Sequence, residues 1–108
     1  MQANLKMDLR NAPRYRVRVF GMARYLKEKA SIRIHNISRS GVAMELGALF
    51  NPGSGSNIVI ESDEFGLLEG TVKWRHGAFV GVQFSRNSNS SAKVDAYFKN
   101  AHQEVRPV

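Results

Sequence analysis

Apolar and polar residues alternate in short segments between residues 14 and 84, and no helical repeat separates these segments. In the first segment, RYRVRV, the apolar side chains of Tyr15, Val17 and Val19 alternate with arginines. A repeat of two places successive side chains on opposite faces of a β-strand. The same repeat occurs in SIRIHNIS from Ser31, GVAMEL from Gly41, NIVIES from Asn57, LEGTVKW from Leu68 and FVGVQF from Phe79. Six closely spaced strands without intervening helices predict an all-β domain, either an antiparallel barrel or a sandwich.

The residues between these segments predict where the chain turns. The run NPGSGS over residues 51–56 predicts a loop. Gly77 lies between two alternating segments and can supply the positive φ of a tight hairpin. Phe20 breaks the alternation just before Gly21, which predicts a bulge or bend at that point.

The last part of the chain has a helical repeat instead. Five apolar side chains recur there at helical spacing: Val94, Tyr97, Phe98, Ala101 and Val105. This stripe predicts an α-helix over residues 90–105, with Ser90 or Ser91 as its N-cap and Pro107 just beyond its end. We expect the helix to dock its stripe on the strands or to close one end of them.

The chain has 108 residues, which is the size of one domain. No segment has the ~18 consecutive apolar residues that a membrane-spanning helix needs, and the N-terminus lacks the apolar core of a secretory signal. The absence of cysteine excludes a disulfide framework, a thiolate nucleophile and a cysteine-built zinc site. We therefore expect a cytoplasmic protein that has no membrane segment.

The positive charge of the chain is concentrated near the N-terminus. The net charge is +8 over residues 1–39, −5 over residues 40–70 and +4 over the remainder, for a total of +7. Such an excess favours a directed anionic partner, and a solvated basic arm is the alternative interpretation.

The residues that build common catalytic sites do not occur together. His35, His76 and His102 are far apart in the sequence, and His35 has the outward parity of its strand. No G-x-S-x-G sequence is present, and the glycine-serine run lacks the lysine of a phosphate-binding P-loop. The acidic residues between 61 and 69 do not have the spacing of a calcium loop. The sequence therefore predicts neither an enzyme nor a metal site.

Two local patterns have residues suited to an anionic ligand. In RNAPR, Arg10 and Arg14 flank a proline directly before the first strand, which favours an extended or turning arm. In NISRSG, Asn36 and Ser38 can cap backbone N–H groups of the turn between the second and third strands. Gly41 allows a backbone conformation that is closed to other residues.

In this order and at this distance apart, the two patterns resemble the signature of the PilZ domain, a bacterial receptor domain for cyclic di-GMP. The family's marks are R-x-x-x-R, followed further along the chain by D/N-x-S-x-x-G, and the segments GTVKW and VGVQF are similar to the family's closing strands. The resemblance covers residues 9–86 and implies a six-stranded antiparallel β-barrel with a C-terminal helix. It divides the chain into a flexible segment over residues 1–9 and one domain over residues 10–108. That domain contains an arm (10–14), a barrel (14–86) and a helix (90–105).

The resemblance also implies the ligand and the residues that bind it. Cyclic di-GMP carries two phosphates and two guanines, and an arginine can pair with guanine O6 and N7 or stack on a purine and reach a phosphate. The resemblance assigns these contacts to Arg10, Arg14, Asn36, Ser38 and Gly41. Secondary candidates are Arg39, Arg16 and Trp74, although the shared parity of Trp74 and Val72 predicts a buried ring. In the family, an additional arginine ahead of the first motif arginine is associated with a stacked ligand pair, and Leu9 at that position favours one ligand per protomer.

The implied function is that of a non-catalytic effector that needs no cofactor. Ligand binding would order the basic arm, and the changed surface would act on a separate protein partner that controls motility, exopolysaccharide production or surface attachment. Two alternatives are a basic barrel that binds RNA or single-stranded DNA nonspecifically, and a PilZ-type adaptor that binds no nucleotide. Strand parity places Tyr15, Trp74 and Phe84 in the core and leaves Phe79 exposed, which disfavours nucleic acid. The presence of both motif arginines disfavours the adaptor.

Overall fold

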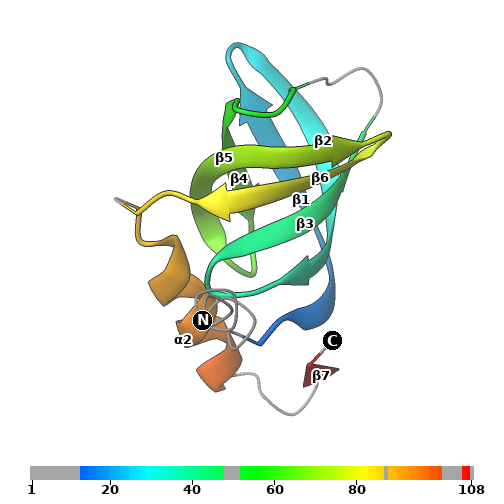
Figure 1. Cartoon of the computed structure of the whole chain (residues 1–108). Helices are drawn as coiled ribbons and strands as arrows, with labels where there is room; N and C mark the ends of the chain where they lie inside the picture. The colour runs from blue at the N-terminus through cyan, green and yellow to red at the C-terminus, as the bar shows by residue number, and fades with distance from the viewer. Residues whose placement is uncertain (1–12, 48–51, 87, 101–105, 108) are drawn as a thin grey trace, which may run out of the picture.

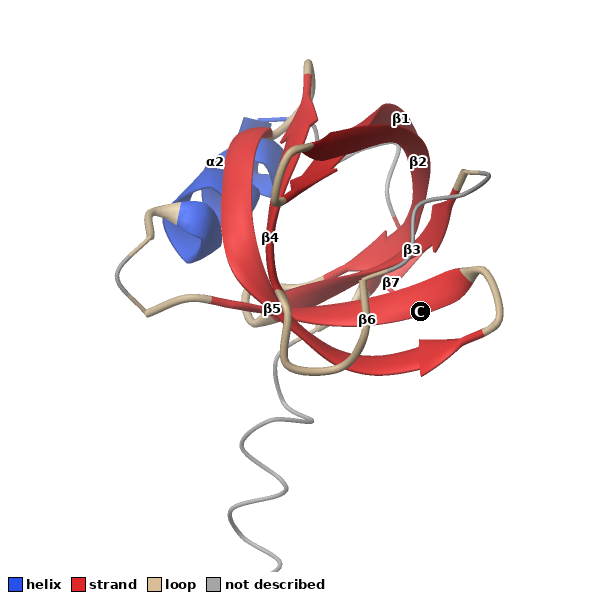
Figure 2. Ribbon diagram, turned by 90° about the horizontal axis from the view of Figure 1, so that it is seen from above, coloured by secondary structure: helices blue, strands red, loops and turns tan. Residues whose placement is uncertain are grey.

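The computed structural model describes residues 13–47, 52–86, 88–100 and 106–107, and in these ranges six strands close into an antiparallel β-barrel (Figure 1, Figure 2). The strands are β1 (Tyr15–Tyr25), β2 (Glu28–Ile37), β3 (Gly41–Leu46), β4 (Asn57–Ser62), β5 (Gly66–His76) and β6 (Phe79–Phe84). They follow the order β2-β3-β6-β5-β4-β1, and the pairing of β1 with β2 closes the ring. A two-residue strand, β7 (Arg106–Pro107), pairs with the start of β1. The predicted all-β fold is confirmed, and the barrel is its architecture.

Two turns that the sequence predicted from its glycines are present among the described residues. Gly77 has a φ of 61° in the β5–β6 hairpin, and Gly55 has a φ of 91° in the loop before β4. The β1–β2 hairpin instead turns at Leu26, which has a φ of 57° and carries no glycine signal in the sequence. Strand β1 therefore continues to Tyr25, well beyond the alternating segment RYRVRV over residues 14–19.

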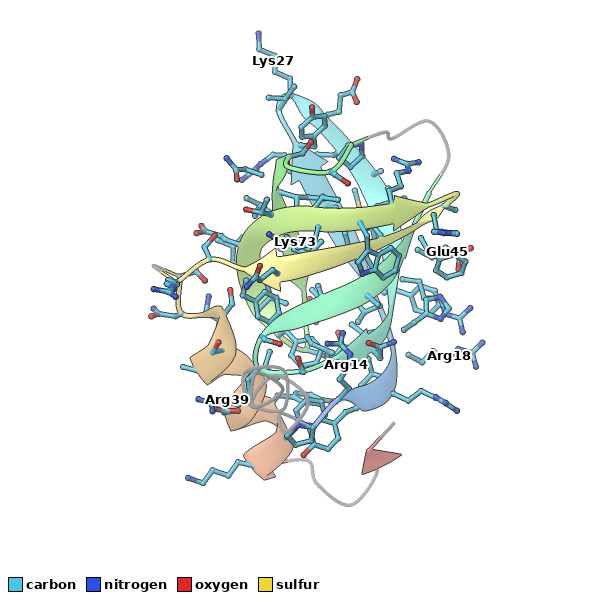
Figure 3. All side chains as sticks on the ribbon, in the orientation of Figure 1. Arg14, Arg18, Lys27, Arg39, Glu45 and Lys73 are labelled. Carbon is cyan, nitrogen blue, oxygen red and sulfur yellow. The ribbon has the colours of Figure 1, made fainter. Side chains whose placement is uncertain are left out.

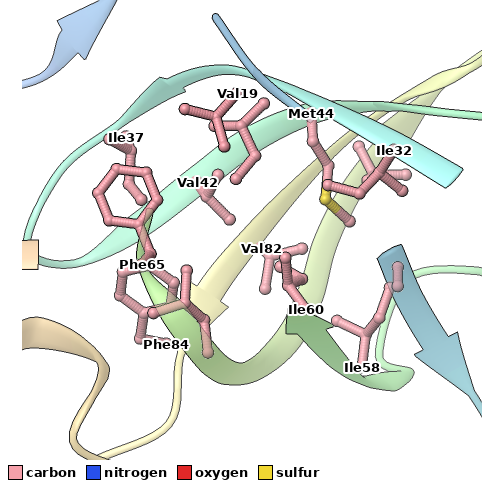
Figure 4. Close-up of a cluster of buried hydrophobic side chains, with 14 of the residues drawn as sticks. Val19, Ile32, Ile37, Val42, Met44, Ile58, Ile60, Phe65, Val82 and Phe84 are labelled. Carbon is pink, nitrogen blue, oxygen red and sulfur yellow. The ribbon is translucent and has the colours of Figure 1, made fainter. Parts of the chain in front are cut away.

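The alternation of side chains fills the barrel with one hydrophobic core (Figure 4). Its fully buried aliphatic side chains come from all parts of the ring and include Ile34, Ile37, Val42, Met44, Ile58, Ile60, Leu68, Val72 and Val80. Burial of a side chain of this kind contributes about 1.5–3 kcal/mol relative to an exposed one. The core thus fixes which side chain of each strand faces outward.

Three register shifts interrupt the regular alternation of inward and outward side chains. They lie between Arg16 and Val19 in β1, between Ile34 and Asn36 in β2, and between Val72 and Trp74 in β5. The bulge predicted at Phe20 and Gly21 is wrong, because both residues pair regularly with β2. Gly21 is required there for space, since a Cβ on it would collide with the carbonyl oxygen of Glu61.

Helix α2 (Ser90–Asn100) docks on one end of the barrel (Figure 2). Val94 is buried, and the rings of Tyr97 and Phe98 pack against Phe65 and Tyr15 at centroid distances of 4.7 Å and 4.2 Å. This part of the predicted stripe is confirmed, whereas Ala101 and Val105 lie outside the described residues. No helix within the described ranges is long and apolar enough to cross a membrane.

The start of α2 differs from the prediction. The backbone N–H of Lys93 donates to the carbonyl oxygen of Asn89 at 3.0 Å, which makes Asn89 the N-cap in place of Ser90 or Ser91. Ser90 is buried, and its Oγ accepts a hydrogen bond from the backbone N–H of Glu69 at 3.1 Å. The side chain of Ser90 is thus committed to holding the helix on β5.

Candidate ligand-binding site

The pairing of β1 with β2 brings Arg14 to the polar residues at the end of β2. Arg14 Nε donates to Asn36 Oδ1 at 2.8 Å, and Nη1 donates to Ser38 Oγ at 3.2 Å. Burial lowers the pKa of Arg14 from its ordinary value, because desolvation disfavours the charged form, yet a guanidinium stays protonated at neutral pH. Figure 3 shows Arg14 at the end of the barrel where α2 lies. The last residue of the first motif therefore contacts the second motif.

Ser38 organises the turn between β2 and β3. Its backbone N–H donates to the carbonyl oxygen of Gly41 at 2.8 Å, and its Oγ accepts from the backbone N–H of Ser40 at 3.1 Å. The hydroxyls of Ser38 and Ser40 are a further 3.0 Å hydrogen-bonded pair. Because Ser38 is only 1% exposed, its main role in this structure is to shape the turn and to orient Arg14.

Glycine is required at position 41 for a different physical reason from the one that the sequence suggested. It is buried, and it is not among the described glycines that have a positive φ. A Cβ on Gly41 would instead collide with the carbonyl oxygen of Val82 on β6. The glycine is required for the close pairing of β3 with β6, on which the turn is anchored.

Arg39 connects this turn to α2. Its Nε lies 3.0 Å from Oδ2 of Asp95, and its carbonyl oxygen accepts a hydrogen bond from Ser91 Oγ. The Arg39 side chain is 62% exposed, so the ion pair is solvated. Asp95 and Ser91 were missed by the sequence reasoning, because no short motif links residues of α2 to a turn some fifty residues earlier; Ser91 and Arg39 are 52 residues apart. Ser40 was missed because it stands at an unspecified position of N-x-S-x-x-G.

The β5 bulge turns Trp74 outward, so the expected burial of this ring is wrong. Trp74 is 45% exposed, and its indole lies over Gly81 of β6, where an added Cβ would meet the ring. In register, Trp74 pairs with Gly81, Gly81 with Ala43, and Ala43 with Asn36. Trp74 itself is three strand spacings from Asn36, but its ring lies over Gly81, which is two strand spacings or about 10 Å from Asn36 on the outer face.

Phe79 is exposed, as strand parity predicted, but it is not the only exposed aromatic side chain on the strands. Phe20 is 63% exposed and Phe79 is 42% exposed, in addition to Trp74. These three rings lie on β1, β6 and β5 and do not follow one another along a strand. Phe84 is buried and Tyr15 is half-buried against α2, in agreement with the prediction.

The remaining candidates lie around this centre or outside it. Arg16 is exposed and pairs in register with Asn36, so its side chain borders the site. Arg10 lies outside the described residues, together with Leu9. His35 Nε2 is 3.1 Å from Oε1 of Glu45 on the barrel wall. Within the described ranges, no three His, Asp or Glu side chains come together as a metal site would require.

Comparison with known families agrees with this geometry. The family model of the PilZ domain matches residues 8–99, a range that contains R-x-x-x-R, N-x-S-x-x-G, the whole barrel and most of α2. No curated protein matches the chain. Because the match extends over most of the sequence and includes both motifs, of which Arg14 and Asn36 are in contact, the chain belongs to the PilZ domain family.

Proposed function

We propose that this PilZ domain is a non-catalytic, cytoplasmic receptor for cyclic di-GMP that signals through a change of its surface. The observation that carries the proposal is the half-buried Arg14 side chain, which Asn36 and Ser38 already hold in place. A guanidinium that is oriented before the ligand arrives loses less side-chain entropy on binding.

The free edge of Arg14 suits the acceptors of this ligand. An arginine side chain has five N–H donors, of which the Nε donor and one Nη1 donor are used by Asn36 and Ser38. The remaining Nη1 and Nη2 donors are adjacent. Such a pair of donors matches guanine O6 and N7, or two oxygens of one phosphate.

Trp74 supports the recognition of a purine. Its exposed ring stands about 10 Å from Asn36 on the same outer face. Stacking of a base on an aromatic side chain contributes about 1–3 kcal/mol. We propose that Arg14 and Asn36 bind the polar edge and phosphate of the ligand, that Trp74 stacks on a guanine, and that Arg10 and Arg16 supply further positive charge.

Ligand binding would affect the rest of the molecule through two connections. Arg14 directly follows the segment that carries Arg10, so a ligand held by both would order that segment against the barrel. The turn is also tied to α2 through Arg39 and Asp95. We propose that the altered surface acts on a protein partner in motility, exopolysaccharide production or surface attachment, the processes that the family resemblance implies.

Calorimetric titration with cyclic di-GMP tests the receptor function. Arg14→Ala should weaken binding by about 30-fold to several thousand-fold, because the loss of one member of a buried charged contact costs about 2–5 kcal/mol. Arg10→Ala should weaken binding in the same direction. GTP and cyclic di-AMP should not bind to the unmodified protein.

Arg24→Ala serves as the matched control, since this arginine is exposed on β1 away from the site. Affinity close to that of the unmodified protein in both Arg10→Ala and Arg14→Ala would overturn the proposed clamp. No binding by the unmodified protein would indicate the adaptor function. RNA binding that falls steeply with salt and ignores the dinucleotide would indicate the nucleic-acid alternative.

A further inference from the structure

The outer face of β1 and β2 carries concentrated positive charge beyond the ligand-binding site. We define the outer β1–β2 face by the outward side chains of Arg18, Phe20, Met22, Arg24, Lys29, Ser31 and Arg33. Four of these seven residues are basic and none is acidic. Each border of this face carries one carboxylate, because Glu61 of β4 pairs in register with Met22 and Glu45 of β3 pairs in register with Arg33.

An apolar pair occupies the middle of this face. Phe20 is 63% exposed and Met22 is 41% exposed, two positions apart on the same side of β1. Arg18 and Arg24 flank them along the strand. Apolar centres with a polar rim are typical of protein–protein interfaces, in which aromatic and arginine side chains contribute most of the binding energy.

Arg33 makes this face selective for carboxylates. Its guanidinium carbon lies 5.9 Å from the centroid of the Phe20 ring, and Ser31 Oγ contacts Met22 Sδ in the next row at 3.9 Å. Among the described residues, Arg33 has no hydrogen-bond or ion-pair partner, and its buried Nε has no acceptor. Glu45, the register neighbour of Arg33 on β3, contacts His35 Nε2 at 3.1 Å and forms no ion pair with Arg33. A carboxylate brought by another molecule would compensate the charge of Arg33.

We propose that the outer β1–β2 face docks an acidic protein segment in which one or two large apolar side chains lie between carboxylates. The apolar side chains would cover Phe20 and Met22, and the carboxylates would pair with Arg33 and its basic neighbours. Single-stranded nucleic acid is a poorer match, because base stacking uses successive rings and this face has one. The inference names the chemistry of the partner that the proposed receptor function requires, and in that respect it rests on that function.

A synthetic peptide, EDEFLEDE, is the probe, and amide chemical shifts of the ¹⁵N-labelled protein are the readout. The peptide should shift resonances of β1 and β2 around Phe20 and Arg33. Phe20→Ala, Arg33→Gln and Arg18→Glu should each weaken the apparent affinity about tenfold, which corresponds to ~1.4 kcal/mol. Lys73→Gln, an exposed cation on β5, should leave the affinity unchanged.

Control peptides separate docking from charge attraction. EDESSEDE, which lacks the apolar pair, should bind at least tenfold more weakly than EDEFLEDE. Equal binding of the two peptides, shifts confined to the α2 end, or tighter binding of oligo-dT than of EDEFLEDE to the same residues at about 0.15 M salt would each overturn the proposal. If Phe20→Ala unfolds, Arg18→Glu still tests the proposal, because Arg18 is exposed and has no side-chain hydrogen bond or ion pair within the described ranges.

Titration of cyclic di-GMP into the same variants distinguishes this inference from the receptor function. Phe20→Ala and Arg18→Glu should bind the nucleotide as the unmodified protein does. If the peptide docks as expected but the unmodified protein does not bind cyclic di-GMP, the receptor function alone is wrong. If the nucleotide binds but the peptide does not dock, the docking surface alone is wrong.

Discussion

At the scale of single residues, Gly41 of the signature and Gly53 of the loop before β4 differ in what surrounds the missing side chain. A Cβ on Gly41 would collide with a backbone carbonyl of β6, which cannot move without breaking the pairing of β3 with β6. A Cβ on Gly53 would meet nothing within 4 Å, and Gly53 has no positive φ. The glycine of the signature is therefore demanded by the packing of strands.

We expect Gly41→Ala to lower the free energy of unfolding by about 1–3 kcal/mol, the usual cost of forcing extra volume into a packed region. Gly53→Ala should leave this free energy unchanged or raise it by about 0.4–1 kcal/mol, because alanine restricts the unfolded chain. Urea denaturation of both variants measures the difference. Equal stabilities would show that the β3–β6 contact can relax.

The contacts of Arg14 could be predicted from the sequence, whereas the exposure of Trp74 could not. The resemblance to the PilZ signature predicted that Arg14, Asn36 and Ser38 act together, and in the structure the antiparallel pairing of β1 with β2 brings them side by side. The outward ring of Trp74 could not be predicted, because the bulge that turns it depends on pairing with β6 and on the space above Gly81. Alternation along one strand contains no information about its partner.

At the scale of elements, α2 is attached to the barrel by two kinds of contact. Its apolar side, with Val94 at 1% exposure, packs on the barrel end. Its first turns hold the β2–β3 turn through Ser91 and Asp95. The helical repeat in the sequence predicted the first kind of contact. The polar contacts join residues more than fifty positions apart, and no spacing rule predicts them.

The two kinds of contact should differ in their effect on stability. Val94→Ala should lower the free energy of unfolding by about 1.5–3 kcal/mol, because it exposes buried apolar surface. Asp95→Ala should lower it by less than about 1 kcal/mol, because its ion pair with Arg39 is solvated. Denaturation of both variants measures the difference. A larger loss for Asp95→Ala than for Val94→Ala would show that the polar contact is the main attachment of the helix.

At the scale of the whole molecule, the proposed ligand-binding site and the β1–β2 hairpin lie at opposite ends of a closed barrel. Figure 3 shows Arg14 and Arg39 near α2 and Lys27 at the far end. Strand β1 has 11 residues, about 36 Å, and runs between the two ends. Because each of the six barrel strands pairs with a neighbour on both sides, the ring has no open edge about which it could hinge. Conformational change on ligand binding should therefore stay local.

Hydrogen exchange with and without cyclic di-GMP tests this restriction. The ligand should slow exchange at the start of β1, in the turn over residues 38–41 and in the first turns of α2, because these segments share the contacts of Arg14 and Arg39. Exchange at the Leu26–Lys27 turn should not change, since the barrel between the two ends is fixed by its core. Arg14→Ala is the control and should abolish the protection. Slower exchange at the far hairpin in the unmodified protein would contradict a rigid ring and would mean that the ligand changes the whole barrel.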